Sequence, residues 1–182
     1  MKFQEKIVKT KDNKEILIRE AKLEDAENLI KTAKKYISTS DHILLTEKDF
    51  NPTIEQEEAW INSFISNKNN LLLLASYKNE IIGNIEITAS KREKIAHTAC
   101  LGMSIIKEYR NLGIGYHLLI SMIDWAKNNP NLKKIWLEVF ATNSNAIALY
   151  KKVGFIQEGI RTDFIKIYEN TYVDDIIMAI KV

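Results

Sequence analysis

Apolar residues recur along the chain at two spacings, which predict alternating strands and helices. Near the start, "QEKIVKTKDNKEILIREA" predicts two short strands around a turn at Asp12-Asn13. Residues 21–37 ("AKLEDAENLIKTAKKYI") and 51–67 ("NPTIEQEEAWINSFISN") then place apolar side chains three and four positions apart, as helices do. The second helix opens with Thr53 and Gln56, which have the spacing of a capping box.

The second half of the chain continues the alternation. "LLLLASY" and "NEIIGNIEITAS" predict a hairpin across Lys78-Asn79, and "AHTACLGMSII" predicts the next strand. Helical spacing follows from Gly113 until Pro130, then a strand in "KKIWLEVF" and a short helix in "SNAIALYKKVGF" that stops at Gly154. "FIQEGIR" and "TYVDDIIMAIKV" predict the closing strands.

This order of elements predicts an α/β (α+β) fold built on one central sheet, with residues 1–182 forming a single domain. The strand, helix and strand from Ala96 to Val139 are expected to form a right-handed crossover with parallel strands. No internal repeat or long linker interrupts the pattern.

Composition and charge narrow the class of protein. Lys and Arg total 26 against 24 Asp and Glu, so the net charge of +2 predicts no nucleic-acid partner. No apolar run approaches the ~18 residues of a membrane span, and the first residues lack the apolar core of a signal peptide. We therefore expect a cytoplasmic protein with no membrane partner; a homodimer, the commonest oligomer in general, stays open.

The reactive side chains are few. The single cysteine, Cys100, cannot form an internal disulfide, and its place in an apolar strand favours a buried structural thiol over a nucleophile. The three histidines, His42, His97 and His117, are scattered, so we expect no metal site.

The stretch "EYRNLGIGYHLL" carries the most specific signal. A glycine-rich turn between a strand and a helix brings bare amides and the positive helix end together, which suits a pyrophosphate; a plain turn explains the glycines equally well. A dinucleotide fingerprint is disfavoured, because its third glycine is replaced by Leu118 and too little chain follows.

The spacing R-x-x-G-x-G, with Arg110, Gly113 and Gly115, resembles the GNAT superfamily of N-acetyltransferases. "LEVFATNSNAIALYKKVGFIQEG" resembles that superfamily's second signature, and the resemblance extends from about Ile16 to Ala179. The tail is similar to the branch of ribosomal-protein and small-amine acetyltransferases. The resemblance implies a mixed, mostly antiparallel, twisted sheet of about seven strands with about four helices, splayed between the strands at 97–106 and 134–140.

The resemblance also implies the substrates: acetyl-CoA as donor and a primary amine as acceptor, which attacks directly in a ternary complex. Backbone amides at the glycine-rich turn would hold the pyrophosphate, and the preceding strand would pair with the pantetheine arm. Asn143 would contact the pantetheine or the turn, although either Asn143 or Asn145 could instead cap the short helix. The cofactor-binding residues are thus expected to be Met103, Ser104, Ile105, Arg110, Asn111, Leu112, Gly113, Ile114, Gly115, Tyr116, Asn143 and Tyr150.

Two residues are predicted to be catalytic. The resemblance places Tyr150 as the general acid that protonates the leaving thiolate, and the alternative is an aromatic that only packs. Glu86 is the predicted base, on a strand beside the acceptor cleft, and a solvated carboxylate is an equal alternative. His97, Glu138 or water could replace Glu86. Because the sequence does not identify one general base, a non-catalytic CoA-binding sensor or docking module is the alternative function.

The acceptor is not identified by the sequence. Residues 37–70 and 84–98 are expected to flank the cleft, and the first of these segments is rich in acidic residues, Glu57 among them. An acidic mouth suits a polyamine or a basic N-terminus. Acids on a helix are more often plain solvated surface, however, so the alternatives stay open.

Overall fold

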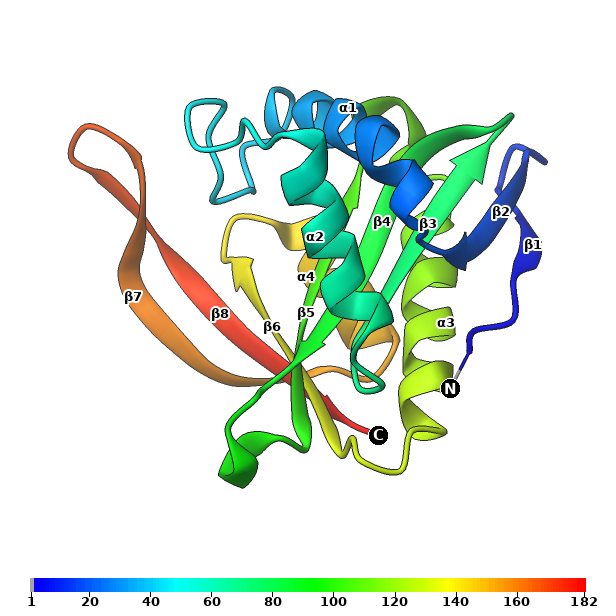
Figure 1. Cartoon of the computed structure of the whole chain (residues 1–182). Coiled ribbons are helices and arrows are strands. Elements are labelled where there is room, and N and C mark those ends of the chain that lie inside the picture. The colour runs from blue at the N-terminus through cyan, green and yellow to red at the C-terminus, as the bar shows by residue number, and fades with distance from the viewer. Residues whose placement is uncertain (1) are drawn as a thin grey trace.

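The computed structural model describes residues 2–182 and arranges the chain around one twisted sheet (Figure 1). The strands are β1 (Lys6–Lys9), β2 (Glu15–Glu20), β3 (Leu71–Tyr77), β4 (Glu80–Ala89), β5 (Thr98–Ile105), β6 (Lys134–Phe140), β7 (Ile156–Tyr168) and β8 (Thr171–Lys181). The helices are α1 (Ala26–Ile37), α2 (Ile54–Ile65), α3 (Ile114–Lys127) and α4 (Ser144–Lys152). The predicted order of elements is confirmed, and the sheet has eight strands in place of about seven.

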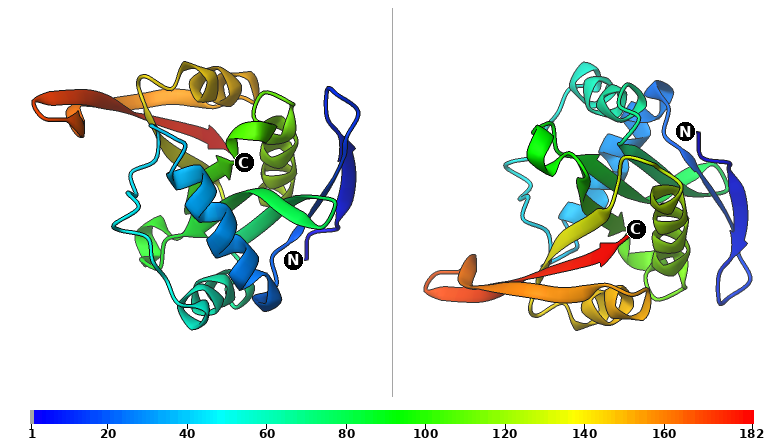
Figure 2. Two further views of the ribbon diagram at one scale, coloured as in Figure 1. Left: turned by 90° about the horizontal axis from the view of Figure 1, so that it is seen from above. Right: turned by 90° about the horizontal axis from the view of Figure 1, so that it is seen from below.

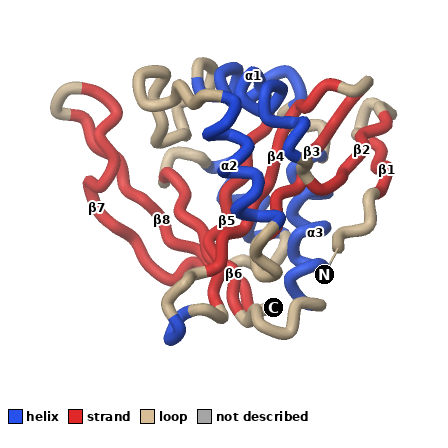
Figure 3. The backbone as a smooth tube through the Cα atoms, in the orientation of Figure 1, coloured by secondary structure: helices blue, strands red, loops and turns tan. Residues whose placement is uncertain are grey.

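The sheet runs in the order β1-β2-β3-β4-β5-β6-β8-β7. Neighbouring strands are antiparallel except for β5 and β6, which are parallel as the strand–helix–strand pattern predicted. The hairpin of β7 and β8 extends away from the helices at one end of the molecule (Figure 3). None of the described helices is long and apolar enough to cross a membrane.

Helices cover both faces of the sheet. α1 and α2 lie on one face, and α3 and α4 lie on the other (Figure 2). The apolar run of β3 packs against both layers of helices, because successive side chains of a strand point to opposite faces of the sheet. Leu72 and Leu74 enter the cluster beneath α1 and α2, whereas Leu71 and Leu73 enter the larger cluster on the other side.

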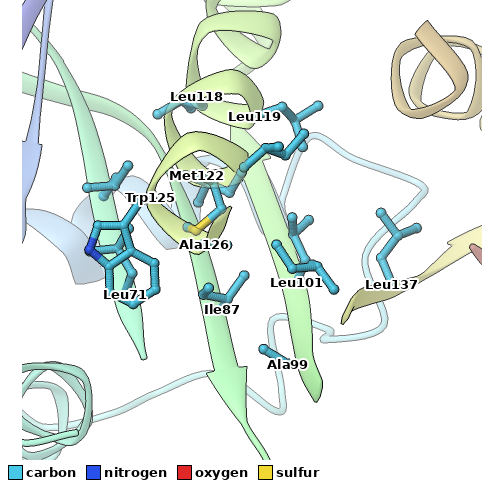
Figure 4. Close-up of a cluster of buried hydrophobic side chains, with 14 of the residues drawn as sticks. Leu71, Ile87, Ala99, Leu101, Leu118, Leu119, Met122, Trp125, Ala126 and Leu137 are labelled. Atoms are coloured by element: carbon cyan, nitrogen blue, oxygen red, sulfur yellow. The ribbon is translucent and has the colours of Figure 1, made fainter. Parts of the chain in front are cut away.

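The larger cluster anchors α3 (Figure 4). Leu118, Met122 and Trp125 recur at helical spacing and pack on the strands together with Leu101 of β5. A helix held by such a face has a fixed axis, so its N-terminal end has a fixed position relative to β5. Two predictions of local structure are also confirmed. Lys78 and Asn79, in the turn before β4, have positive φ values of 49° and 67°. Thr53 and Gln56 form the capping box of α2.

The pairing between β5 and β6 stops early. Only Thr98, Ala99 and Cys100 pair with Lys134, Ile135 and Trp136. β5 then continues to Ile105 along β4, and β6 continues to Phe140 along β8, so their facing edges separate. The predicted splay is therefore confirmed.

Cys100 departs from its predicted setting. β5 alternates between buried residues such as Ala99 and Leu101 and half-buried ones, and Cys100 is half-buried. Burial, together with the charges of Glu138 and Glu86, raises the pKa of Cys100 to about 11. The thiol therefore stays protonated at neutral pH, as an unreactive cysteine does.

We predict that Gly83→Ala destabilises the fold by about 2 kcal/mol, a typical cost of overpacking. A Cβ at Gly83 would lie 2.7 Å from the backbone oxygen of Ser104, where β4 and β5 pair. Gly159→Ala is the matched control, because its Cβ would lie 3.8 Å from the nearest atom of Ile177. Urea unfolding measures both variants, and equal free energies of unfolding for the two would contradict the prediction.

Candidate active site

A cleft of about 690 Å³ opens beside the splay, between the sheet and the α1–α2 layer. Its walls come from α1, the segment 42–52, α2, the facing parts of β4, β5 and β6, Asp175 of β8, and α4 with its N-cap. Several predicted site residues meet in this wall, namely Glu86, Met103, Ser104, Asn143 and Tyr150.

Glu86 is the central acid of the cleft. It is half-buried on β4, and the side-chain amide of Asn84 donates a hydrogen bond of 2.7 Å to its Oε2. Burial raises the pKa of Glu86 to about 7, and the Asn84 hydrogen bond opposes that shift. The carboxyl group therefore exchanges its proton near neutral pH, which a general acid or base requires.

Gly102 makes room for that carboxylate. It pairs with Glu86 across β4 and β5, and a Cβ at Gly102 would overlap Glu86 Oε1 and lie 3.0 Å from Glu86 Cδ. The Glu86 side chain thus lies over bare backbone. Glycine inside a strand often marks such a close approach.

Two tyrosines, the buried Tyr150 and the half-buried Tyr36, share the cleft with Glu86. Burial and, secondarily, the charge of Glu86 raise the pKa of Tyr150 to about 12. Burial also raises the pKa of Tyr36 on α1, with smaller contributions from the charges of Glu86 and Glu57, while a side-chain hydrogen bond with Ser104 opposes the shift. Both phenols therefore keep their protons at neutral pH and can donate hydrogen bonds into the cleft.

The glycine-rich turn lies at the start of α3. Gly113 is the N-cap at φ 93°, a left-handed conformation that glycine adopts without strain. Within the described chain, no hydrogen bond occupies the backbone N–H groups of residues 111–116. Six amides without hydrogen bonds therefore lie at the positive end of a packed helix, as at known anion sites.

Arg110 and Gly115 help to fix the position of the turn. The Arg110 amide donates to the Lys107 carbonyl, so the predicted group of free amides begins at Asn111. The Arg110 Nε donates to the Ile105 carbonyl at 2.9 Å, which braces the turn against β5. A Cβ at Gly115 would lie 3.1 Å from Leu149 Cδ2, so this glycine allows α3 to pack closely against α4.

Comparison with known proteins gives the family. A profile of the acetyltransferase (GNAT) family matches residues 38–155. The chain belongs to this family. A GNAT-family acetyltransferase structure from Streptococcus pneumoniae superposes with a TM-score of 0.89 at 32% identity, covering 92% of this chain and 99% of that one.

Two further relatives are informative. The L-amino acid N-acetyltransferase AaaT of Escherichia coli (strain K12) is 31% identical over 107 residues, which are 59% of this chain and 65% of its own length. A putative acetyltransferase from Salmonella typhimurium, solved with acetyl-CoA, has a TM-score of 0.80 at 15% identity, covering 91% of this chain and 93% of that one. The latter likeness shows the GNAT fold alone.

The other candidate bases are less well placed in this GNAT fold. Glu138 lines the cleft but forms an ion pair with Arg161, which also donates from Nε to Asp175 at 2.9 Å. The partner of Glu138 in the structure is therefore an arginine. His97 lies in an exposed turn before β5, outside the cleft wall. Among residues 2–182, no ion pair involves Glu86, in contrast to Glu138.

Asn143 caps α4. Its Oδ1 accepts a hydrogen bond of 3.2 Å from the Ala146 amide, whereas Asn145 is exposed within the helix. The helix-capping alternative is therefore correct for Asn143, which nevertheless lines the cleft. Its contact with CoA stays a prediction.

Sequence reasoning did not assign roles to Tyr36, Asn84, Gly102 or Asp175. Gly102 carried a usable signal, since a glycine in a strand often indicates close approach. Tyr36 lies at the end of an amphipathic helix and gave no signal, because its place in the cleft depends on how α1 packs on the sheet. Among residues 2–182, no group of three or more His, Cys, Asp or Glu side chains is placed to hold a metal ion.

We predict that Glu86 makes stability depend on pH. Its pKa rises from the usual 4.5 to about 7 on folding, so the folded state keeps a proton that the unfolded state loses. Stability should then fall by about 3 kcal/mol as pH rises from about 4.5 to about 7.

Glu86→Gln should remove that part of the pH dependence, and Glu93→Gln, an exposed acid in the turn before β5, should not. Chemical unfolding at several pH values measures how the free energy of unfolding of each variant depends on pH. Parallel stability curves for the wild type and Glu86→Gln would contradict the prediction.

Proposed function

We propose that the protein is an acetyl-CoA-dependent N-acetyltransferase that transfers an acetyl group to a primary amine by direct attack in a ternary complex. The carrying observation is the open edge of β5, which lies between the free amides of the turn and the Glu86–Tyr150 cleft. Acetyl-CoA in the Salmonella structure and the activity named for the E. coli relative support this proposal.

The donor would lie along the splay. The amides of residues 111–116 and the N-terminus of α3 would bind its pyrophosphate, and Lys152, whose Nζ lies 5.1 Å above the Tyr116 ring, would add positive charge nearby. The pantetheine arm would pair with the edge of Met103, Ser104 and Ile105 that β6 leaves open, as an added strand does. The thioester would then reach the cleft between Glu86 and Tyr150.

The chemistry follows from the protonation states. Glu86 accepts a proton from the acceptor ammonium group, and the neutral nitrogen then attacks the thioester carbonyl while a backbone N–H of the open β5 edge stabilises the oxyanion. This attack forms the new C–N bond; collapse of the tetrahedral intermediate breaks the C–S bond, and the nitrogen loses its second proton to water. Tyr150, which keeps its proton because burial raises its pKa to about 12, donates that proton to the departing thiolate.

The decisive experiment is an acceptor panel with acetyl-CoA, followed by release of free thiol, alongside calorimetric titration of CoA. Polyamines, simple alkyl and aryl amines, amino acids and ribosomal-protein N-terminal peptides cover the chemical classes. CoA binding without turnover of any amine would favour the alternative, a non-catalytic CoA sensor. Absence of both binding and turnover would reject both functions.

We predict that Tyr150→Phe lowers kcat by about 10²-fold, the usual contribution of a general acid. The phenyl ring keeps the packing against Phe155, whose ring centre lies 5.7 Å away, so the fold and CoA affinity should change little. Steady-state kinetics and CoA calorimetry measure the two effects. An unchanged kcat at every pH would exclude Tyr150 from the proton transfer.

We predict that kcat/KM rises with pH through a pKa of about 7, because deprotonated Glu86 is the active form. Glu86→Gln should lower kcat/KM by at least about 10²-fold and remove this rise. Gly102→Ala should produce a similar loss, since its Cβ displaces the same carboxylate.

Because both changes act on one group, the double variant should be no worse than the poorer single variant. Fully additive losses in the pH-rate profiles would show that Gly102 acts independently of Glu86.

A further inference from the structure

The charged side chains of the cleft wall are nearly all acidic. Glu57, Glu86, Glu138 and Asp175 line it, and the wall contains no lysine or arginine; His42 is its one basic residue. Arg161, beside the wall, is already bound by Glu138 and Asp175. A ligand carboxylate would therefore meet like charge and find no free guanidinium or ammonium group in the wall.

Glu57 is the unusual member of this set. It lies on α2, is 7% exposed, and lines the cleft. Within residues 2–182, its carboxylate has neither an ion pair nor a hydrogen bond, and burial alone raises its pKa. The residue is largely buried, but its carboxylate oxygens are not among the buried unpaired atoms, so the group faces the cleft and is suited to a cation that arrives with a ligand.

Asn84 gives a second, independent observation. This cleft residue is 4% exposed, and its Nδ2 is used by Glu86, whereas its buried Oδ1 has no hydrogen-bond donor in the described chain. An orphaned acceptor needs an N–H or O–H donor. An ammonium group would thus supply a donor for Asn84 and a positive charge for Glu57, whereas a carboxylate would supply neither.

The remaining wall is apolar. Leu44 and Leu45 in the segment before α2 are 62% and 47% exposed, and Trp60 of α2 is 36% exposed. All three line the cleft, with Leu29 and Ala33 of α1 beneath them. Exposed apolar side chains gathered at a cleft favour a ligand with apolar surface to bury.

We propose that the acceptor is an amine with an apolar alkyl or aryl body and no carboxylate beside the amino group, and that Glu57 binds its positive charge. The proposal rests on the proposed function for its assignment to the acetyl acceptor. It separates this chain from its E. coli relative, which is named for amino acids. Glu57 is a binding residue here, while Glu86 takes the proton.

The test compares amines with amino acids that differ from them only by the carboxylate. The full chain, with and without CoA, is titrated by calorimetry at neutral pH with phenethylamine and L-phenylalanine, and with pentylamine and L-norleucine. Each amine should bind at least about tenfold more tightly than its amino acid, because like charges repel in the cleft. L-Phenylalaninamide, which keeps the size but loses the negative charge, should resemble phenethylamine.

Glu57→Gln should weaken phenethylamine binding by at least about tenfold and leave CoA binding unchanged. Glu58→Gln is the matched control, with the same charge change at the next position of α2 but outside the cleft wall. Amino acids that bind as well as the amines, failure of both amines to bind, or equal effects of the two variants would overturn the proposal. The wild-type ligand series decides the question even where Glu57→Gln does not fold.

These experiments distinguish a failure of amine binding from a failure of acetyl transfer. Selective amine binding with no thiol release from acetyl-CoA would reject the proposed function and retain the cation site at Glu57. Turnover of amino acids in preference to their matched amines would retain the transferase and reject the charge selection.

Discussion

The separation of β5 from β6 is the constraint on which the rest of the site depends. Two parallel strands that remained paired would consume the backbone groups of residues 101–105 and close the sheet. They pair only as far as Cys100 and Trp136. Beyond that point β5 stays paired with β4, and β6 stays paired with β8. Each strand therefore keeps one hydrogen-bonded neighbour although its other edge is open. The cleft on one face and the proposed anion site on the other meet at this opening.

Glycine serves three different purposes around the opening, and only the structure separates them. Gly113 permits a left-handed φ at the N-cap of α3. Gly115 allows α3 to approach Leu149, and Gly102 leaves space for the Glu86 carboxylate. A substitution at each position would therefore fail for a different reason: backbone strain, helix packing or displacement of an acid.

Local signals were sufficient for the elements and for the position of the glycine-rich turn. Periodicity predicted the four α-helices, the Lys78-Asn79 turn was predicted from its residue types, and the Arg110–Gly115 spacing predicted the turn at the start of α3, whose binding of an anion stays a prediction. Long-range packing could not be predicted in this way. Two features depend on how α2, β6 and β7 meet, and no short pattern encodes them: the lack of an ion pair or hydrogen bond at Glu57 within residues 2–182, and the pairing of Glu138 with Arg161. The motif position of Asn143 was compatible with two roles, a contact with CoA and a helix cap. The hydrogen bond from the Ala146 amide confirms the cap.

The proposed donor-binding and acceptor-binding parts of the site come from separate parts of the chain. The proposed donor contacts come from β5, α3 and α4, whereas the proposed acceptor contacts come mainly from α1, α2 and the segment between them. Substitutions in residues 26–65 can therefore reshape what the cleft accepts without disturbing the turn at residues 110–116. Such an arrangement allows a lineage to diversify its acceptors while the donor half is inherited unchanged.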